Sequence, residues 1–446
     1  MRVLKIKLLL TILLLPGVLA AQETWGLKTC MTYALKNHKS TRVYENNRII
    51  ADAQVLEARA AYLPSLNITG SIVDNVKPQV SVIPAGAFSA TDMKVAFTKQ
   101  YNTTGTAELT QTIYDQAAIT GMRAGKYTRE QVALNDKKNQ ELLIYNVSVA
   151  YYQVYVYRLQ LDMLSVNLNS YEEQIKISQI GVQKGVTTET DLSKIKVNYN
   201  NTLSNISVAQ TNLEYYETQL KNAMGYPLQQ PLQLDSMSIY DDVFQNQLAL
   251  ENDSLNVQQR TDYRLSQVNA SLLDISARQI RAGAFPQLSA YARYGIQGFG
   301  DQFNEATKNF NDVSVIGINL KFPVFTGFKR QAQYTQAKYK QLNAMENSAI
   351  DADSYAVEYK NAKAKLVQSS VNVTATRENV IMAEQVFEST DLQYQKGVTD
   401  LTDWLNAQNS LKEAQGNFLN AVYTYYTATI ELEKAKGTLI NFYTSL

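Results

Sequence analysis

A duplicated plan of long helices constrains this chain more than any other feature of its sequence. The segment from Lys184 to Thr187 returns in the second half of the chain as the segment from Lys396 to Thr399. Before and after these segments, apolar side chains recur at alternating steps of four and three residues, as they do over 143–182 and 355–394. This 3.5-residue period is typical of helices that supercoil around one another. The sequence therefore predicts paired helical rods joined at two glycine turns.

The repeat extends beyond the turns. Arg59 to Pro64 resembles Arg281 to Pro286, at nearly the same separation along the chain as the two turns. We expect repeat 1 at 22–226, a linker at 227–250 and repeat 2 at 251–446. In order, the predicted elements are a first helix, a β-hairpin at about 64–115, a long helix at about 117–183 and a returning helix at about 188–224, then in repeat 2 a first helix, a hairpin at about 286–325, a long helix at about 327–395 and a returning helix at about 400–437. Neither long helix contains proline, so each is expected to be a rod of roughly 100 Å.

The amino terminus indicates export. Arg2, Lys5 and Lys7 precede an apolar run from Leu8 to Leu15, which is too short for a membrane-spanning helix. Small residues near Ala21 follow, so residues 1–21 are predicted to be a secretory signal peptide. Beyond them, no stretch approaches the roughly 18 uncharged apolar residues of a transmembrane helix.

Composition excludes several functions. Without the three cations of the signal peptide, the chain has 39 basic and 41 acidic residues, which gives no basic surface for nucleic acid. Cys30 and His38 are the only cysteine and histidine, so a disulfide framework, a metal site and nucleophilic catalysis are not expected. No cofactor is predicted, and the chain is not expected to be an enzyme. Cys30 lacks the small-residue context of a lipidation site and is expected to lie on a helix face.

Four segments alternate in the manner of membrane strands, two in each hairpin. One set of side chains is apolar, as at Leu66, Ile68 and Ile318, and the other carries polar groups. Glu108, Arg293 and Lys321 are all expected on the polar face; the segments from about 76 to 101 and from about 298 to 312 are expected to be exposed turns.

Four strands cannot close a barrel, and open edges in hydrocarbon leave backbone groups without partners. The predicted fold class is therefore an α+β membrane protein, with long α-helical coiled coils and a shared antiparallel transmembrane β-barrel. Three copies would give twelve strands, and two or four copies remain possible by arithmetic. Eight strands leave little lumen, which disfavours a dimer for a duct.

In the order and spacing of these features, the chain resembles the TolC family of outer-membrane efflux proteins. The resemblance runs from Trp25-Gly26-Leu27 to Ala435-Lys436-Gly437 and includes the glycine turns and the duplication. It implies a homotrimer in the outer membrane, with a shared twelve-stranded β-barrel that continues into a long α-helical coiled-coil periplasmic barrel. It also implies a passive channel for efflux or type I secretion, whose partners are an inner-membrane pump and a periplasmic adaptor.

The resemblance also implies roles for residues near the turns. The adaptor would grip the helix tips, which comprise Lys184, Gly185, Val186, Thr187, Lys396, Gly397, Val398 and Thr399. Asp403 matches the first aspartate ring of the pore constriction, while Asn406 stands at the second ring position and Asp400 lies beside them. For the clasp that holds the tips closed, Asp191 and Tyr394 match, but Thr399 replaces an arginine. Helix capping is the alternative role for Asp191, Asp400 and Asp403.

Two alternatives to this interpretation remain. A pore-less periplasmic coiled coil would have the same helical stripes, and it would be a soluble protein. Within the family, metal-ion efflux is disfavoured because His, Cys and Met form no series of soft ligands along the chain. Organic solutes are the expected cargo, although the pump selects the substrate.

Overall fold

The computed structural model describes residues 24–86, 90–235 and 254–446. The predicted signal peptide lies outside the described residues, and so does most of the predicted linker, from 236 to 250.

The chain forms two compact units, and each unit draws on both sequence repeats. The sheet unit consists of Tyr44–Asn135 and Asp262–Asp351. The helical unit consists of Met1–Val43, Asp136–Thr261 and Ala352–Leu446. The repeats are therefore divisions of the sequence and do not correspond to the compact units.

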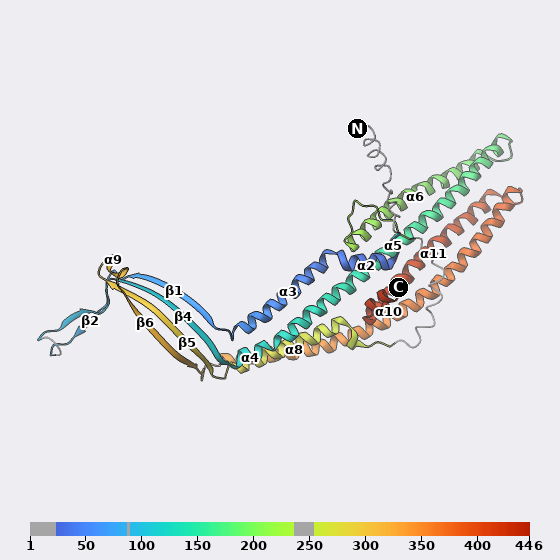
Figure 1. The fold of residues 1–446 in the computed structure, drawn as a ribbon. Coiled ribbons are helices and arrows are strands. Elements are labelled where there is room, and N and C mark those ends of the chain that lie inside the picture. Colours follow the sequence, from blue (N-terminus) through green and yellow to red (C-terminus); the bar gives the residue numbers. More distant parts are fainter. Residues whose placement is uncertain (1–23, 87–89, 236–253) are drawn as a thin grey trace, which may run out of the picture. The chain divides into compact units, whose positions relative to one another are not determined.

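The elements follow one another in the order that Figure 1 labels. They are α2 (Leu27–Asn37), α3 (Lys39–Ala60), β1 (Ser65–Asp74), β2 (Val80–Ile83), β3 (Met93–Ala96), β4 (Tyr101–Asp115), α4 (Gln116–Met122), α5 (Ala124–Gln183), α6 (Glu189–Met224), the 3₁₀-helix η2 (Val257–Gln259), α8 (Thr261–Ala282), β5 (Gln287–Gly300), α9 (Phe303–Ala306), β6 (Phe310–Lys321), α10 (Lys329–Gln395), α11 (Leu401–Lys436) and α12 (Leu439–Ser445). The helix expected at 117–183 is divided at Arg123 into α4 and α5. Asp115 caps α4 by accepting hydrogen bonds from the backbone N–H groups of Ala117 and Ala118.

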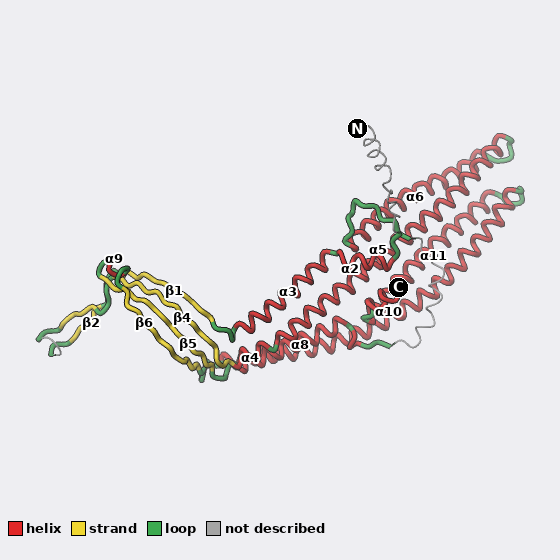
Figure 2. Tube along the Cα trace, viewed as in Figure 1, coloured by secondary structure: helices red, strands yellow, loops and turns green. Residues whose placement is uncertain are grey.

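A four-stranded antiparallel sheet dominates the sheet unit, with the strand order β1-β4-β5-β6 (Figure 2). Side chains directly opposite one another on neighbouring strands share a face. One row across the sheet is Leu66, Leu109, Ala292 and Ile316. The adjacent row is Asn67, Glu108, Arg293 and Val315. The predicted division into an apolar and a polar face is therefore confirmed, and the pairing of Lys321 with Gln287 places Lys321 on the polar face.

The structure corrects two details of the strand prediction. The expected alternation through Ile113 breaks at a bulge between Thr112 and Tyr114, which places Tyr114 opposite Leu288. The two segments expected to be simple turns also contain secondary structure. A second hairpin, β2–β3, lies within the first, and the helix α9 lies within the second.

In the helical unit, α2, α5, α6, α10, α11 and α12 share one apolar core. The duplication of the sequence is also visible in the way that α6 and α11 end. Gly225 and Gly437, which hold equivalent positions in the two repeats, end α6 and α11 with φ angles of 68° and 75°, a conformation that favours glycine. A Cβ on Gly225 would meet the His38 Cα at 3.0 Å, and one on Gly437 would meet the Arg260 Cα at 3.1 Å. His38 and Arg260 are themselves equivalent in the two repeats, so each repeat packs a residue preceding a helix against the glycine that ends another.

Arg260 is a buried charge with close partners, since only 4% of the residue is exposed. Its Nη1 atom donates to the Ala435 carbonyl at 2.8 Å and lies 2.8 Å from a Glu358 carboxylate oxygen. Its guanidinium lies 3.9 Å from the centre of the Tyr355 ring. These contacts offset the cost of removing the charge from water.

Candidate functional site

The two predicted helix tips have the same local construction. Gly185 and Gly397 have φ angles of 72° and 73°, so the chain can reverse where α5 and α10 end. The N–H of Val186 then bonds to the Gly181 carbonyl, and the N–H of Val398 bonds to the Gln393 carbonyl, both at 2.9 Å. Val186 and Val398 are 79% and 73% exposed. Lys184 and Lys396 are also exposed, while Thr187 and Thr399 are partly buried.

The first tip starts α6 with a threonine cap. Thr188 accepts a hydrogen bond from the backbone N–H of Asp191 at 3.0 Å, and its hydroxyl donates to the Asp191 carboxylate at 2.7 Å. Lys194 donates to the other carboxylate oxygen at 3.0 Å. The hydrogen bond from Thr188 and then that from Lys194 lower the pKa of Asp191. Asp191 is therefore held within its own tip.

The second tip repeats this arrangement with an aspartate cap. Asp400 accepts from the backbone N–H of Asp403 at 3.0 Å, and the hydroxyl of Thr399 donates to the Asp403 carboxylate at 2.6 Å. Asp400 is therefore the N-cap of α11, which is the alternative role that capping offered it. Asp403 and Asn406 are both exposed and lie one helical turn apart, so they share a face of α11.

The structure does not join the residues of the predicted clasp. Within the described tips, no hydrogen bond links Asp191 to Tyr394 or Thr399. Thr399 bonds Asp403, and the Tyr394 ring lies 6.5 Å from the Trp404 ring in a tilted orientation. The clasp and the pore ring accordingly stay predictions.

An aromatic cluster beside the second tip joins the two helical hairpins. Trp404, next to Asp403, is 1% exposed and packs edge-on against Tyr171 of α5, with 5.7 Å between ring centres. Phe387 of α10 lies 5.6 Å from the same indole, and the indole Nε1–H donates to Asp391 at 2.7 Å. Tyr171 lies in the apolar stripe of residues 143–182 and Trp404 lies beyond the second turn, and the sequence did not predict that they are in contact. The only indication in the sequence was that Tyr171 lies a few helical turns before Gly185 and Trp404 a few turns or less after Gly397.

The described residues contain neither a cluster of metal ligands nor a membrane-spanning helix. In residues 24–86, 90–235 and 254–446, no group of three or more His, Cys, Asp or Glu side chains is placed to hold a metal ion. None of the helices in the described part of the chain has the length and apolar character to cross a membrane.

Comparison with known families gives the chain its assignment. Residues 31–226 and 254–438 match the family model described as outer membrane efflux protein. The chain belongs to the outer membrane efflux protein family. The resemblance to the TolC family and the location in the outer membrane are thereby confirmed.

Individual members of the outer membrane efflux protein family match over most of the chain. Outer membrane protein TolC of Salmonella enteritidis is 24% identical over 347 residues, which are 76% of this chain and 69% of TolC. The proteases secretion protein PrtF of Dickeya chrysanthemi is 23% identical over 446 residues, which are 98% of this chain and 92% of PrtF. A crystal structure of CusC has the same fold, with a TM-score of 0.73, 17% identity and 92% of each chain covered.

Proposed function

We propose that this chain is one protomer of a trimeric outer-membrane channel. The channel passively conducts solutes from the periplasm to the exterior when it is docked to an inner-membrane pump and a periplasmic adaptor. The proposed assembly is a shared twelve-stranded barrel that continues into a helical periplasmic tunnel. The similarity to TolC and PrtF, one a family namesake and the other named for secretion, supports efflux or secretion as its role.

One observation carries the proposal: a sheet with two open edges, one apolar face and one polar face. Ile316, Ile68 and Ile318 are 88%, 79% and 70% exposed on the apolar face. Exposure of such apolar side chains to water is unfavourable, whereas their contact with lipid is stable. Among the described residues, no further strand pairs with the outer edges of β1 and β6. Pairing β1 of one copy with β6 of the next satisfies the backbone groups of these edges, and three copies enclose a water-filled lumen.

In this assembly, the polar face of the sheet lines the lumen of the barrel. Glu108 and Arg293 lie opposite each other, with the Arg293 Nε donating to the Glu108 carboxylate at 2.7 Å. Lys321 lies on the same face. At the periplasmic entrance, Asp403 and Asn406 would form rings at the constriction, with Asp191, Tyr394 and Thr399 available for a neutral clasp. The exposed turns Lys184 to Thr187 and Lys396 to Thr399 would receive the adaptor.

Organic solutes are the proposed cargo. Exported polypeptide is the second candidate, since PrtF is named for the secretion of proteases. Metal ions fit less well, because the single cysteine is fully buried.

Membrane fractionation and channel recording test the proposal. We expect the mature protein in the outer-membrane fraction, a detergent-extracted particle of three chains, and discrete conductance steps in a planar bilayer. A soluble monomer without channel activity would instead support a pore-less coiled coil. Co-purification of the native adaptor and pump would identify the partners. If neither is found with the channel purified from crosslinked cells, that part of the proposal is overturned.

A further inference from the structure

Side-chain amides recur along two neighbouring helices of the helical unit. On α5 they stand at every seventh position, at Asn139, Asn146, Gln153, Gln160, Asn167 and Gln174. On α6 they stand at Asn198, Asn205, Asn212 and Gln219, with the same heptad spacing. Residues one heptad apart keep the same orientation in a helix that supercoils with a 3.5-residue period. Each helix therefore carries an amide stripe in addition to its apolar stripe.

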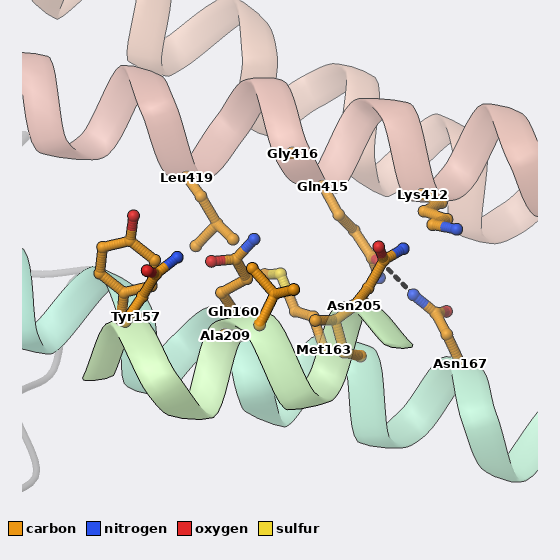
Figure 3. A pocket seen from close by; sticks show the side chains of 13 residues that line it. Tyr157, Gln160, Met163, Asn167, Asn205, Ala209, Lys412, Gln415, Gly416 and Leu419 are labelled. Atoms are coloured by element: carbon orange, nitrogen blue, oxygen red, sulfur yellow. Dashed lines mark hydrogen bonds between the residues drawn. The ribbon is translucent and has the colours of Figure 1, made fainter. Parts of the chain in front are cut away.

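Asn139, Asn167 and Gln174 of the α5 stripe are buried, and the remaining amides that line hollows lie on one face of the unit. A hollow of about 340 Å³ is bounded by α5, α6 and α11, and Gln160 and Asn205 line it (Figure 3). Asn212 of α6 lines it as well. A second hollow of about 530 Å³ continues along α5 and α6, where Asn146 and Gln219 contribute to its lining. The two hollows follow one another along the helices, so one continuous face carries the amides.

The opposite face of α5 is covered by other parts of the chain. Arg158 lies five residues after Gln153, which is about 140° around the helix. Its guanidinium donates to the Leu234 carbonyl at 3.4 Å and to Glu217 of α6 at 2.7 Å.

The short helices α2 and α12 lie on this covered side as well. Burial raises the pKa of Tyr151 to about 12, and the nearby Cys30 of α2 and Asp235 contribute to the rise; Tyr151 lies two residues before Gln153, about 160° around α5. Thr32 of α2 and Tyr443 of α12 are joined through their hydroxyl groups at 3.1 Å. The covered face therefore carries added layers of chain, while the amide face carries hollows.

We propose that the amide face is the wall of the conduit and that Gln160, Asn205 and Asn212 line its bore. The inference rests on the proposed function. A tube of helices needs an unobstructed inner surface for a water-filled passage, and α2, α12 and the segment at Leu234 would fill that passage if they pointed inward. They fit only on the outside of the tube, which leaves the amide face to the inside.

A wall of this chemistry has a definite consequence for transport. Amides donate and accept hydrogen bonds, so they keep water and polar solutes at the surface, and they carry no charge to retain an ion. Among the described residues that line the two hollows, Lys412 is the one lysine, arginine or carboxylate side chain. The bore is therefore a nearly uncharged surface of amide and apolar groups that passes solutes of either charge, and discrimination between ions is left to Asp403 at the tip.

One buried group ties the wall to its neighbour. Asn167 is 2% exposed and donates a hydrogen bond to Gln415 at 2.9 Å (Figure 3). It also accepts a hydrogen bond from Gln408 at 3.0 Å. Both partners belong to α11. Paired amides at a helix interface fix the register of the two helices, so Gly416, Lys412 and Gln160 stay around the same hollow.

Cysteine accessibility tests the proposal. The native Cys30 is fully buried and its pKa is raised to about 12 by burial, so the wild type offers an unreactive background. We would introduce Gln160→Cys and Asn212→Cys, with Asn169→Cys as the matched control. Asn169 is exposed and lies nine residues after Gln160, about 180° around α5. A cationic methanethiosulfonate would be added to conducting channels in a planar bilayer.

The expected result is a stepwise loss of current at Gln160→Cys and Asn212→Cys and none at Asn169→Cys, although mass spectrometry should show all three labelled in detergent. Gln160→Glu and Asn212→Asp provide a second measurement, because each should raise the permeability ratio of K⁺ to Cl⁻ while Asn169→Asp leaves it unchanged. A conducting wild type whose Gln160 and Asn212 variants do not respond, or a loss of current at Asn169→Cys, would overturn this inference alone. A wild type that never conducts would overturn the proposed function and the inference with it.

Discussion

Replacing Asp400 tests whether this aspartate stabilises the second helix tip as a helix cap. Its carboxylate accepts the Asp403 N–H at 3.0 Å, as the N-cap of α11. Loss of an N-cap costs about 1 kcal/mol, whereas asparagine caps about as well as aspartate. We therefore expect Asp400→Ala to loosen the first turn of α11 and Asp400→Asn to leave it intact.

The assay is hydrogen exchange, read by mass spectrometry on peptides that contain residues 401–404 of the detergent-solubilised protein. A cost of about 1 kcal/mol corresponds to about a fivefold loss of protection for amides that exchange by local fraying. Thr188→Ala, at the cap of α6, should cost a similar amount in its own tip. Equal protection in Asp400→Ala and the wild type would refute the capping argument, and so would equal losses in the alanine and asparagine variants.

A variant of the neighbouring Asp403 addresses conduction. Asp403 is exposed and does not provide the cap, so Asp403→Asn should preserve exchange protection. If three Asp403 carboxylates ring the pore, their removal should lower cation preference and weaken block by multivalent cations. Unchanged selectivity in Asp403→Asn would contradict the pore role while leaving the cap in place.

Three further predictions concern other charged or reactive groups. Glu108→Gln leaves Arg293 without its carboxylate partner and should shift the reversal potential toward anion preference, while Arg293→Gln should shift it the other way; shifts of the same sign would contradict a lumenal location. Because the pKa of Asp191 is lowered in the fold, its contribution to the first tip is complete above its ordinary pKa and is lost as pH falls through the lowered value, so exchange protection there should fall in acid, and Asp191→Asn should remove that dependence. Burial raises the pKa of Cys30 to about 12, so native protein at pH 8 should resist a thiol reagent that reacts fully after denaturation in guanidinium; prompt reaction of the native protein would refute the burial.

Local patterns in the sequence predicted much of the architecture. The glycine turns at Gly185 and Gly397 follow from the left-handed conformation that glycine adopts freely. The alternation around Ile68 and Ile318 predicted two faces, and the strand register agrees with it. These features depend on residues near one another in the chain, and for this reason the sequence reveals them.

Other features depend on which segments lie side by side. Nothing in the sequence near Trp404 states that Tyr171, on another hairpin, packs against its ring. The bulge at Ile113 depends on how β4 and β5 pair along their whole length. The alternation of side chains does not reveal it, and the sequence therefore predicted a regular strand through Ile113. The hairpin β2–β3 was missed because its proline- and glycine-containing surroundings are typical of turns.

The sequence by itself determined that there are long supercoiled helices, two tips at which the chain reverses, and the four strands of the main sheet with an apolar and a polar face. It did so because hydrophobic period and glycine geometry act over a few residues. Only the tertiary structure decided which aspartate caps its helix and which face of α5 remains open. That face is decided by α2 and α12, which come from distant parts of the chain and cover the other side, and a heptad spacing of amides carries no information about them.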